Sequence, residues 1–268
     1  MSNSRTIKQD AQESVKSSSR APEGMAGLAK GLAVIEAFDI RHPQLTVTDA
    51  AQRTNTSRAA ARRCLLTLVE LGYLTHDNGN FRPTPRMLRL SGAYLDTAPL
   101  PQLAQPQLTE ARDALDESVS LAVLEDGWAL FVARAEATRI VSTGVRVGAK
   151  LPAHNSATGR VLLAGLTDTQ LDDYLRQCNL QTRTPQTLTE IDAVRERILA
   201  ARESSMAYTD EEIELGMLSI AVPVRNARGE TVAAMSVSAS TARTTLHDLQ
   251  EAAVPVLNEY AERLGRLL

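Results

Sequence analysis

The sequence predicts an α+β protein, with an N-terminal winged helix-turn-helix and a second domain built on a mainly antiparallel sheet. Short helical patterns follow one another as far as Leu71, and a short turn separates the second from the third. An Asn-Gly pair between two strand-like runs comes next, which is the strongest local signal for a β-hairpin. Beyond about residue 99, helices and paired strands are mixed rather than strictly alternating, which favours an α+β domain.

The first part of the chain contains the helix-turn-helix and its wing. Apolar residues recur every three or four positions, and Ser or Thr precedes each helical run as a cap. A first domain at residues 25–85 is therefore expected. A disordered arm over 1–24 is expected before it. The elements expected in the domain are a helix from Met25 that ends before Arg41, a helix capped by Thr46 or Thr48, a helix from Thr56 or Ser57 to Leu71, and wing strands at 73–76 and 80–82.

A linker helix at residues 86–98 and a second domain at 99–268 follow. Prolines cluster at Pro99, Pro101 and Pro106, which predicts the domain boundary. The elements expected beyond it are helices at 105–117, 156–165 with Ser156 as cap, 168–179, 190–204 opened by a capping box of Thr189 and Asp192, and 245–267 kinked at Pro255, with strands at 119–124, 128–134, 139–147, 219–224 and 231–239.

Length and composition exclude several classes of protein. A chain of 268 residues suits two domains, and 43% hydrophobic with 23% charged residues is ordinary globular usage. No apolar run approaches the roughly 18 residues of a membrane span, and residues 1–24 lack the apolar region of a secretory signal. Cys64 and Cys178 have no metal-ligand spacing. We therefore expect a cytoplasmic protein without membrane segment, disulfide, metal or cofactor.

The net charge of −3 conceals an asymmetry. Residues 1–95 carry 13 Lys and Arg against 8 Asp and Glu, whereas the remainder carries 16 against 24. Such a division points to a polyanion-binding part joined to a part with another task.

The predicted third helix is the first candidate binding surface. Arg58 and Arg62 stand one helical turn apart, with Arg63 beside them. The start of the second helix of a helix-turn-helix enters the DNA major groove, where Arg pairs with guanine or contacts phosphate. A merely solvated helix face is the alternative, and the turn, the wing and the local positive charge make it the weaker one. The DNA-contacting residues we expect are Thr56, Ser57, Arg58, Arg62, Arg63 and Arg82.

The loop at 151–159 is the second candidate. Its polar side chains precede a helix start, and unpaired N–H groups at such an end suit an anion. Arg134 and Arg139 lie in or beside strands that can bring a guanidinium to the same place, where two hydrogen bonds hold a carboxylate. The alternatives are an ordinary loop hydrogen bond for His154 and surface positions for the arginines.

The strand at 232–239 is the third candidate. Ser236 and Ser238 alternate with apolar residues, so both point to one face, and Ser219 is their counterpart on the partner strand. The serines line a cavity or a solvated sheet face, and the sequence does not decide between them. The acidic run 210–214 is more typical of an exposed turn or short helix than of catalysis. Catalytic motifs are absent, so we do not expect an enzyme.

Several segments resemble the IclR family of bacterial transcriptional regulators. They are LAKGLAVIEAF, SRAAARRCLLTLVELGYL, FRPTPRMLRL, LPAHNSATGRVLLAG, YTDEEIELGMLSIAVPV and GETVAAMSVSAS, in the family's order and over nearly all of the chain after the arm. The segment ARAEATRIVSTGVRVGAKLPAHNSATGRVLLA is similar to the branch that controls protocatechuate and 4-hydroxybenzoate genes.

The resemblance implies a GAF-like effector-binding domain and a homodimer or tetramer that binds palindromic double-stranded operator DNA. It implies a small carboxylate effector, aromatic in this branch. The alternatives are an aliphatic carboxylate, a DNA-tethered enzyme that turns its ligand over, and a constitutive architectural DNA-binding protein. The expected effector-binding residues, partly from the loop and strands above and partly from the family's pocket positions, are Arg134, Arg139, His154, Ser156, Ala157, Gly159, Thr209, Met217, Ser219, Ser236 and Ser238.

Overall fold

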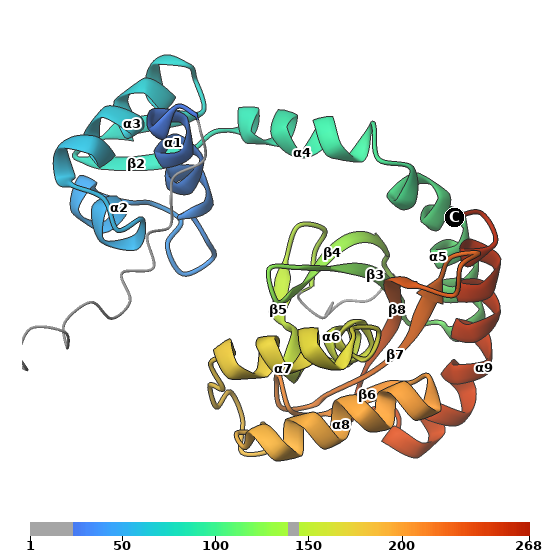
Figure 1. Ribbon diagram of the computed structural model, residues 1–268. Coiled ribbons are helices and arrows are strands. Elements are labelled where there is room, and N and C mark those ends of the chain that lie inside the picture. The colour runs from blue at the N-terminus through green and yellow to red at the C-terminus, as the bar shows by residue number, and fades with distance from the viewer. Residues whose placement is uncertain (1–23, 139–144) are drawn as a thin grey trace, which may run out of the picture. The chain divides into compact units, whose positions relative to one another are not determined.

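The computed structural model describes residues 24–138 and 145–268, which divide into two compact units with the boundary between Leu90 and Ser91 (Figure 1). The expected winged helix-turn-helix and the mainly antiparallel sheet are both present. Within the described residues, no helix is long and apolar enough to cross a membrane.

The N-terminal unit is a three-helix domain with a two-stranded wing. Ser57 caps the third helix by accepting a hydrogen bond from the Ala60 N–H at 3.2 Å, and a capping box of Thr46 and Asp49 opens the second. Leu65 and Phe81 are buried in its core. The elements are α1 (Ala26–Glu36), α2 (Val47–Arg53), α3 (Arg58–Glu70), β1 (Leu74–Asp77), β2 (Asn80–Pro83), a short 3-10 helix (Pro85–Met87) and the start of α4 (Leu88–Leu95).

The first helix ends before Arg41, as predicted. It ends at Glu36, because the Asp39 carboxylate accepts the backbone N–H groups of Arg41 and His42 at 2.8 Å each and forms a turn. Leu28 and Leu32, two of the regularly spaced apolar residues of this helix, are 62% and 47% exposed.

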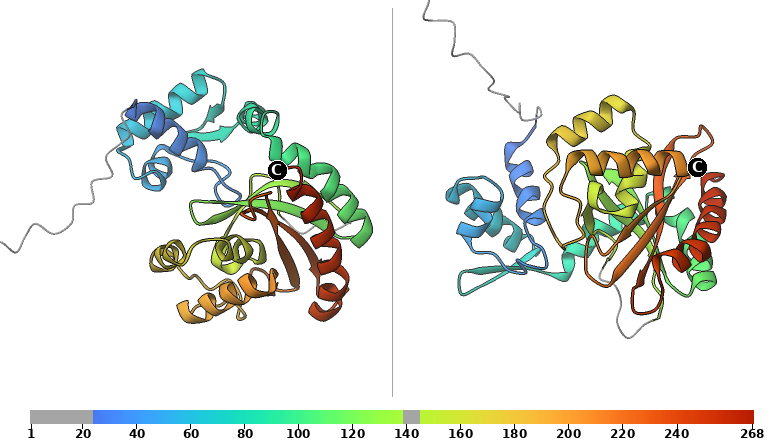
Figure 2. Two further views of the ribbon diagram at one scale, coloured as in Figure 1. Left: turned by 45° about the vertical axis from the view of Figure 1, so that its right-hand side comes forward. Right: turned by 90° about the horizontal axis from the view of Figure 1, so that it is seen from below.

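The C-terminal unit is a six-stranded antiparallel sheet with helices on both faces. The strand order is β5-β4-β3-β8-β7-β6. Helices α5 and α9 cover one face, α6 lies on the other, and α7 and α8 pack beside α6 (Figures 1 and 2). The elements are α5 (Pro99–Leu115), β3 (Ser118–Glu125), β4 (Trp128–Ala135), β5 (Lys150–Pro152), a 3-10 turn (Ala153–Asn155), α6 (Ala157–Ala164), α7 (Asp168–Gln177), α8 (Ile191–Ser204), β6 (Ala207–Asp210), β7 (Met217–Arg225), β8 (Thr231–Ser240) and α9 (Leu246–Gly265).

Strand alternation separates the two faces of this sheet. Leu121, Ile220 and Met235 point toward α5 and α9 and belong to one apolar core. Residues of the opposite parity, among them Ala122 and Ala234, pack against α6. The polar side chains of the strands lie on this second face.

Three predictions in this unit, on the start of α5, the cap of α8 and the acidic run, were wrong. Helix α5 begins at Pro99 and not at Gln105, because proline is tolerated in the first helical turn, where the N–H groups lack helical partners. The edge strand β5 pairs with β4 after a turn over Arg146–Ala149, and most of the predicted strand 139–147 lies outside the described residues. Helix α8 begins after Glu190 without the expected capping box. The start of the acidic run belongs to strand β6.

Candidate functional site

The arginines at the start of α3 form an exposed cationic surface. Arg58, Arg62 and Arg63 are all exposed, and no ion pair or hydrogen bond of their guanidinium groups is found among the described residues. Ser57 is engaged as the helix cap, and the Thr56 hydroxyl lies 2.8 Å from that of Thr54. Ser57 and Thr56 therefore fix the start of α3, while the arginines remain available to a polyanion.

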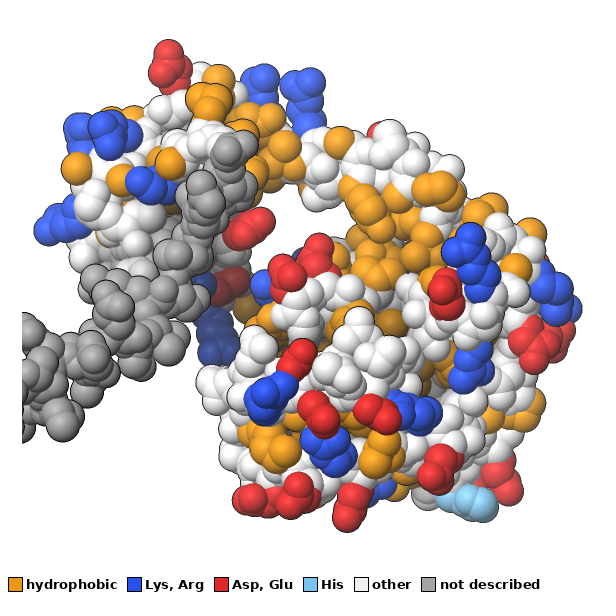
Figure 3. Space-filling model, viewed as in Figure 1, with side chains coloured by type: hydrophobic (Ala, Val, Ile, Leu, Met, Phe, Trp, Pro, Cys, Tyr) orange, Lys and Arg blue, Asp and Glu red, His pale blue; other side chains and the backbone are white. Residues whose placement is uncertain are grey.

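The wing adds a further exposed cation. Arg82 on β2 donates two hydrogen bonds to Gln44 Oε1, at 2.9 and 2.8 Å, which holds its side chain in place. Several Lys and Arg side chains stand out on the N-terminal unit, whereas acidic and basic side chains interleave over the C-terminal unit (Figure 3). The positioned guanidinium of Arg82 on the wing and the exposed arginines at the start of α3 are together suited to contacts with DNA phosphates and bases.

Polar side chains form two adjacent rows on the buried sheet face of the C-terminal unit. Directly opposed residues on antiparallel strands share a face, so the strand register defines each row. The first row contains Arg134, Ser120 and Ser236, and the second contains Ser118, Ser238, Ser219 and Thr209. We call these the hydroxyl rows.

Hydrogen bonds join neighbours within the hydroxyl rows. Arg134 Nη1 donates to Ser120 Oγ at 2.9 Å, and the hydroxyls of Ser219 and Ser238 lie 2.8 Å apart. The Arg134 side chain is only 8% exposed, and burial lowers its pKa, which the Glu136 carboxylate partly offsets. A guanidinium beside several hydroxyls on a buried face can bind a carboxylate together with a hydroxyl group.

The structure places most of the other predicted effector residues around this face. Met217 starts β7 on the same face as Ser219, and Ala157 packs in the apolar cluster between α6 and the sheet. Ser156 uses its hydroxyl as the cap of α6, accepting from the Gly159 N–H at 3.1 Å. Gly159 allows α6 to approach Ala153, because a Cβ there would lie 2.2 Å from Ala153 Cα. Arg139 lies outside the described residues.

His154 does not join the hydroxyl rows. Its Nδ1 lies 2.7 Å from the Tyr174 hydroxyl, and its backbone N–H donates to that same oxygen at 3.1 Å. The ring lines a cavity of about 460 Å³ beside α7, to which none of the hydroxyl-row residues contributes. The structure therefore places His154 and the strand serines apart, because the imidazole contacts Tyr174 on α7.

Burial keeps the His154 ring neutral. It lowers the pKa of His154 to about 4, and the nearby Arg160 and Arg183 contribute. Burial also raises the pKa of Tyr174, so its phenol keeps its proton. The Tyr174 oxygen accepts the His154 backbone N–H, and the direction of its second hydrogen bond, with Nδ1, depends on the imidazole tautomer.

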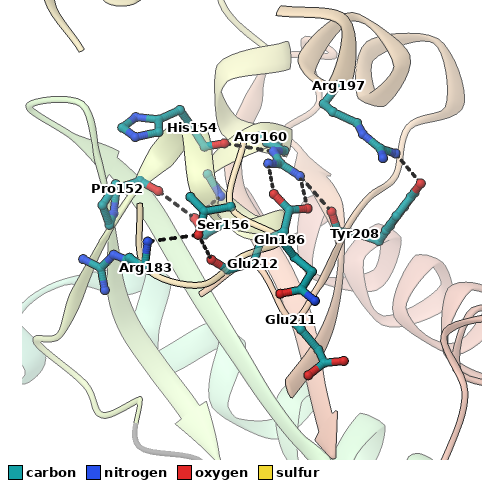
Figure 4. A network of polar contacts seen from close by, with 12 residues as sticks. Pro152, His154, Ser156, Arg160, Arg183, Gln186, Arg197, Tyr208, Glu211 and Glu212 are labelled. Carbon is teal, nitrogen blue, oxygen red and sulfur yellow. Dashed lines mark hydrogen bonds and ion pairs between the residues drawn. The ribbon is translucent and has the colours of Figure 1, made fainter. Parts of the chain in front are cut away.

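A buried ion pair that the sequence did not predict joins α6 to the segment after β6. Arg160 is 1% exposed, and its Nη1 and Nη2 donate to Glu212 Oε1 and Oε2 at 2.9 and 2.5 Å. Arg160 also donates to the carbonyl oxygens of His154 and Tyr208 (Figure 4). A single cation inside the apolar run of α6 was the available signal, and Glu212 was wrongly expected in an exposed turn.

Among residues 24–138 and 145–268, no group of three or more His, Cys, Asp or Glu side chains is placed to hold an ion.

Comparisons with known proteins match both units. The description "Bacterial transcriptional regulator IclR C-terminal" fits residues 92–266, and "IclR helix-turn-helix domain" fits residues 27–78. The Pca regulon regulatory protein of Pseudomonas putida is 40% identical over 88% of this chain and 81% of its own length. The p-hydroxybenzoate hydroxylase transcriptional activator of Acinetobacter baylyi is 39% identical over 93% of this chain and 94% of its own.

A solved structure of an IclR homologue is also similar to this chain. The IclR homologue from Microbacterium hydrocarbonoxydans, crystallised in complex with 4-hydroxybenzoate, is 28% identical with a TM-score of 0.72, over 91% of this chain and all of its own. The family matches together span nearly every described residue of both units. The chain therefore belongs to the IclR family of bacterial transcriptional regulators, in the branch that contains the two regulators named above.

Proposed function

We propose that this regulator responds to an aromatic carboxylate, such as 4-hydroxybenzoate or protocatechuate, and controls genes for aromatic catabolism. The hydroxyl rows are the observation that carries the proposal, because they put the Arg134 guanidinium and several hydroxyls on one buried face. Arg134 would hold the carboxylate, and Ser236 or Ser238 would bind a ring hydroxyl. The names of the relatives, and the 4-hydroxybenzoate bound to one of them, support the aromatic class.

The DNA partner is a double-stranded operator, read by Arg58 and Arg62 at the start of α3 with Arg82 on the wing. We infer a homodimer or tetramer, because α1 and α4 leave several apolar side chains exposed, among them Leu28, Leu88 and Tyr94. In this proposal the DNA-binding domain spans residues 25–85, the linker helix 86–98 and the effector-binding domain 99–268.

Ligand titrations test the effector class. We expect 4-hydroxybenzoate or protocatechuate, at about 100 times its Kd, to stabilise the full-length chain by about 2.7 kcal/mol, whereas succinate does not. Ser236→Ala with Ser238→Ala should weaken this shift, and Ser204→Ala, at an exposed end of α8, is the matched control. Absence of a shift with every aromatic acid would contradict the proposal.

Three further measurements test the regulator itself. Fluorescence anisotropy with DNA from upstream of neighbouring catabolic genes should show that the stabilising acid changes operator affinity, since such coupling is reciprocal. Recovery of the acid unchanged after long incubation is expected of a sensor, and its conversion would instead show an enzyme. Light scattering gives the oligomeric state.

A further inference from the structure

A glutamine beside the wing lies directly opposite one of the exposed arginines. Leu45 and Phe81 form an antiparallel bridge, in which the Leu45 N–H donates to the Phe81 carbonyl at 3.0 Å and the Phe81 N–H donates to the Leu45 carbonyl at 2.9 Å. Both side chains are buried. Side chains alternate along extended chain, so the next pair, Gln44 and Arg82, faces away from this core, and both residues are exposed.

Gln44 occupies one edge of the Arg82 guanidinium and leaves another edge open. Arg82 Nε and Nη2 both donate to Gln44 Oε1, at 2.9 and 2.8 Å. Among residues 24–138 and 145–268, no other partner of this guanidinium is found. Nη1 and the second N–H of Nη2 therefore form an open fork at the end of the side chain. Such a fork matches two oxygen atoms of a phosphate group.

The contact with Gln44 orients the guanidinium of Arg82 and leaves its charge in place. The glutamine amide is neutral, and so is Thr75, which lies opposite Arg82 on β1. Arg53 in the same unit differs, because its guanidinium forms an ion pair with the Asp39 carboxylate at 2.6 Å. Arg82 thus combines a defined orientation with a positive charge that no acidic side chain of the described residues neutralises.

The hydrogen bonds between Gln44 and Arg82 serve binding better than folding. Both side chains are exposed, so water competes for these bonds and they contribute little to stability. A mobile arginine loses side-chain entropy when it binds, and one that is already held loses less. We propose that Gln44 is a positioning residue for DNA binding, which orients Arg82 so that its open fork binds a phosphate of the DNA backbone. This inference rests on the DNA-binding surface proposed above.

A double-mutant cycle tests the role of Gln44. The probe is a fluorescently labelled DNA duplex of arbitrary sequence, because a phosphate contact carries no sequence information. Gln44→Ala should weaken binding by about two- to tenfold, which corresponds to the entropy of ordering one long side chain at an interface. In the Arg82→Ala background, Gln44→Ala should have no effect, because the side chain that it orients is gone. An equal loss in both backgrounds, or no loss in either, would overturn the proposal.

The salt dependence of binding separates orientation from charge. Arg82→Ala should lower the slope of log K against log salt by about 0.9, because one phosphate contact is lost. Gln44→Ala should leave the slope unchanged, since Arg82 can still reach the phosphate. Gln44→Glu still accepts from Arg82 but adds a negative charge beside the open fork, so it should weaken binding more than Gln44→Ala and lower the slope. An unchanged slope in Arg82→Ala would overturn the proposal.

Thermal unfolding distinguishes positioning from a structural role of Gln44. Gln44→Ala and the unmodified chain should unfold at the same temperature, because the buried side chains of Leu45 and Phe81 hold this part of the wing together. A lower melting temperature together with weaker DNA binding in the Arg82→Ala background would show a structural role instead. Gln181→Ala, at an exposed position of the C-terminal unit, is the matched control and should change neither measurement.

A variant of α3 distinguishes failure of this inference from failure of the proposed DNA-binding surface. Arg58→Ala with Arg62→Ala should weaken binding of the same duplex and lower its salt slope, because two cations are removed. If this variant and Arg82→Ala both bind DNA as the unmodified chain does, the proposed surface is wrong. If the α3 variant binds more weakly and Arg82→Ala does not, the surface stands and the role of Gln44 is overturned.

Discussion

Arginines serve opposite purposes in the two units. Arg58 and Arg62 on α3 are exposed, and no partner for either guanidinium is found in the part of the chain that the structure describes. Arg160 on α6 is buried, and its guanidinium donates to the Glu212 carboxylate and to two carbonyl oxygens. An exposed arginine keeps its hydration until DNA replaces it, whereas a buried one must be satisfied within the fold.

We therefore expect the exposed arginines to contribute to DNA affinity and the buried arginine to contribute to folding stability. Substitutions in the cationic surface of α3 should change DNA binding and leave folding intact. Substitutions around Arg160 should change folding first. The following predictions test this separation, from the largest expected effect to the smallest.

Breaking the buried ion pair should have the largest effect. Arg160→Met leaves the Glu212 carboxylate buried without its partner, and we expect a loss of about 3–5 kcal/mol in the free energy of unfolding. Urea titration followed by Trp128 fluorescence measures it. The double variant Arg160→Met with Glu212→Leu should recover much of the loss, and a double variant no more stable than Arg160→Met would contradict this account.

Removal of the exposed arginines should weaken DNA binding and leave the stability of the fold unchanged. Arg58→Ala or Arg62→Ala should each weaken specific operator binding by about 1–3 kcal/mol, if the guanidinium reads a base edge. If it contacts phosphate, the slope of log K against log salt should fall by about 0.9 for each lost contact. Unfolding should change by no more than about 0.5 kcal/mol. Arg176→Ala on the exposed side of α7 is the matched control and should leave operator affinity unchanged.

Replacement of a glycine by alanine should lower the free energy of unfolding in the C-terminal unit and raise it in the N-terminal unit. Gly159→Ala places a Cβ 2.2 Å from Ala153 Cα, so we expect a loss of about 1–3 kcal/mol from overpacking. Gly31→Ala in α1 meets nothing within 4 Å and should gain about 0.5–1 kcal/mol from helix propensity. Thermal unfolding of both variants checks this, and a stabilised Gly159→Ala would show that α6 can move away from Ala153.

Moderate acid should destabilise the C-terminal unit only. The pKa of His154 is about 4 in the fold, against about 6.5 when unfolded, so the unfolded state binds the proton first as pH falls from 6.5 to 4. We expect a loss of about 1–2 kcal/mol over this range, allowing for solvent screening. The pKa of Asp39 is lowered to about 2, chiefly by its hydrogen bond with His42, so its contribution to the N-terminal unit is lost only below pH 4.

Hydrogen exchange read by mass spectrometry resolves the two units in this experiment. His154→Gln should flatten the pH dependence of the C-terminal unit. Equal acid sensitivity of the variant and the unmodified chain would show that another group controls it.

Local patterns in the sequence were enough to predict most of the fold. The wing followed from Asp77, Asn78 and Gly79, because Asn78 and Gly79 both adopt positive φ in the turn, as an Asn-Gly hairpin requires. Thr56 or Ser57 was predicted to cap the third helix and Ser156 to cap α6, and the observed caps are Ser57 and Ser156. The face shared by Ser219, Ser236 and Ser238 followed from strand alternation alone. These features depend on residues close in sequence, whose backbone geometry local sterics and hydrogen bonds determine.

The tertiary structure decided the features that join distant segments. Fifty-two residues separate Arg160 from Glu212, and twenty separate His154 from Tyr174. Neither spacing carries a local signal, because only the packing of α6 and α7 in the C-terminal unit brings these partners together. The sequence by itself therefore determined the helix-turn-helix, the wing and the polar face of the sheet. The fold decided that Arg160 is a structural cation, and that His154 belongs to a cavity of its own.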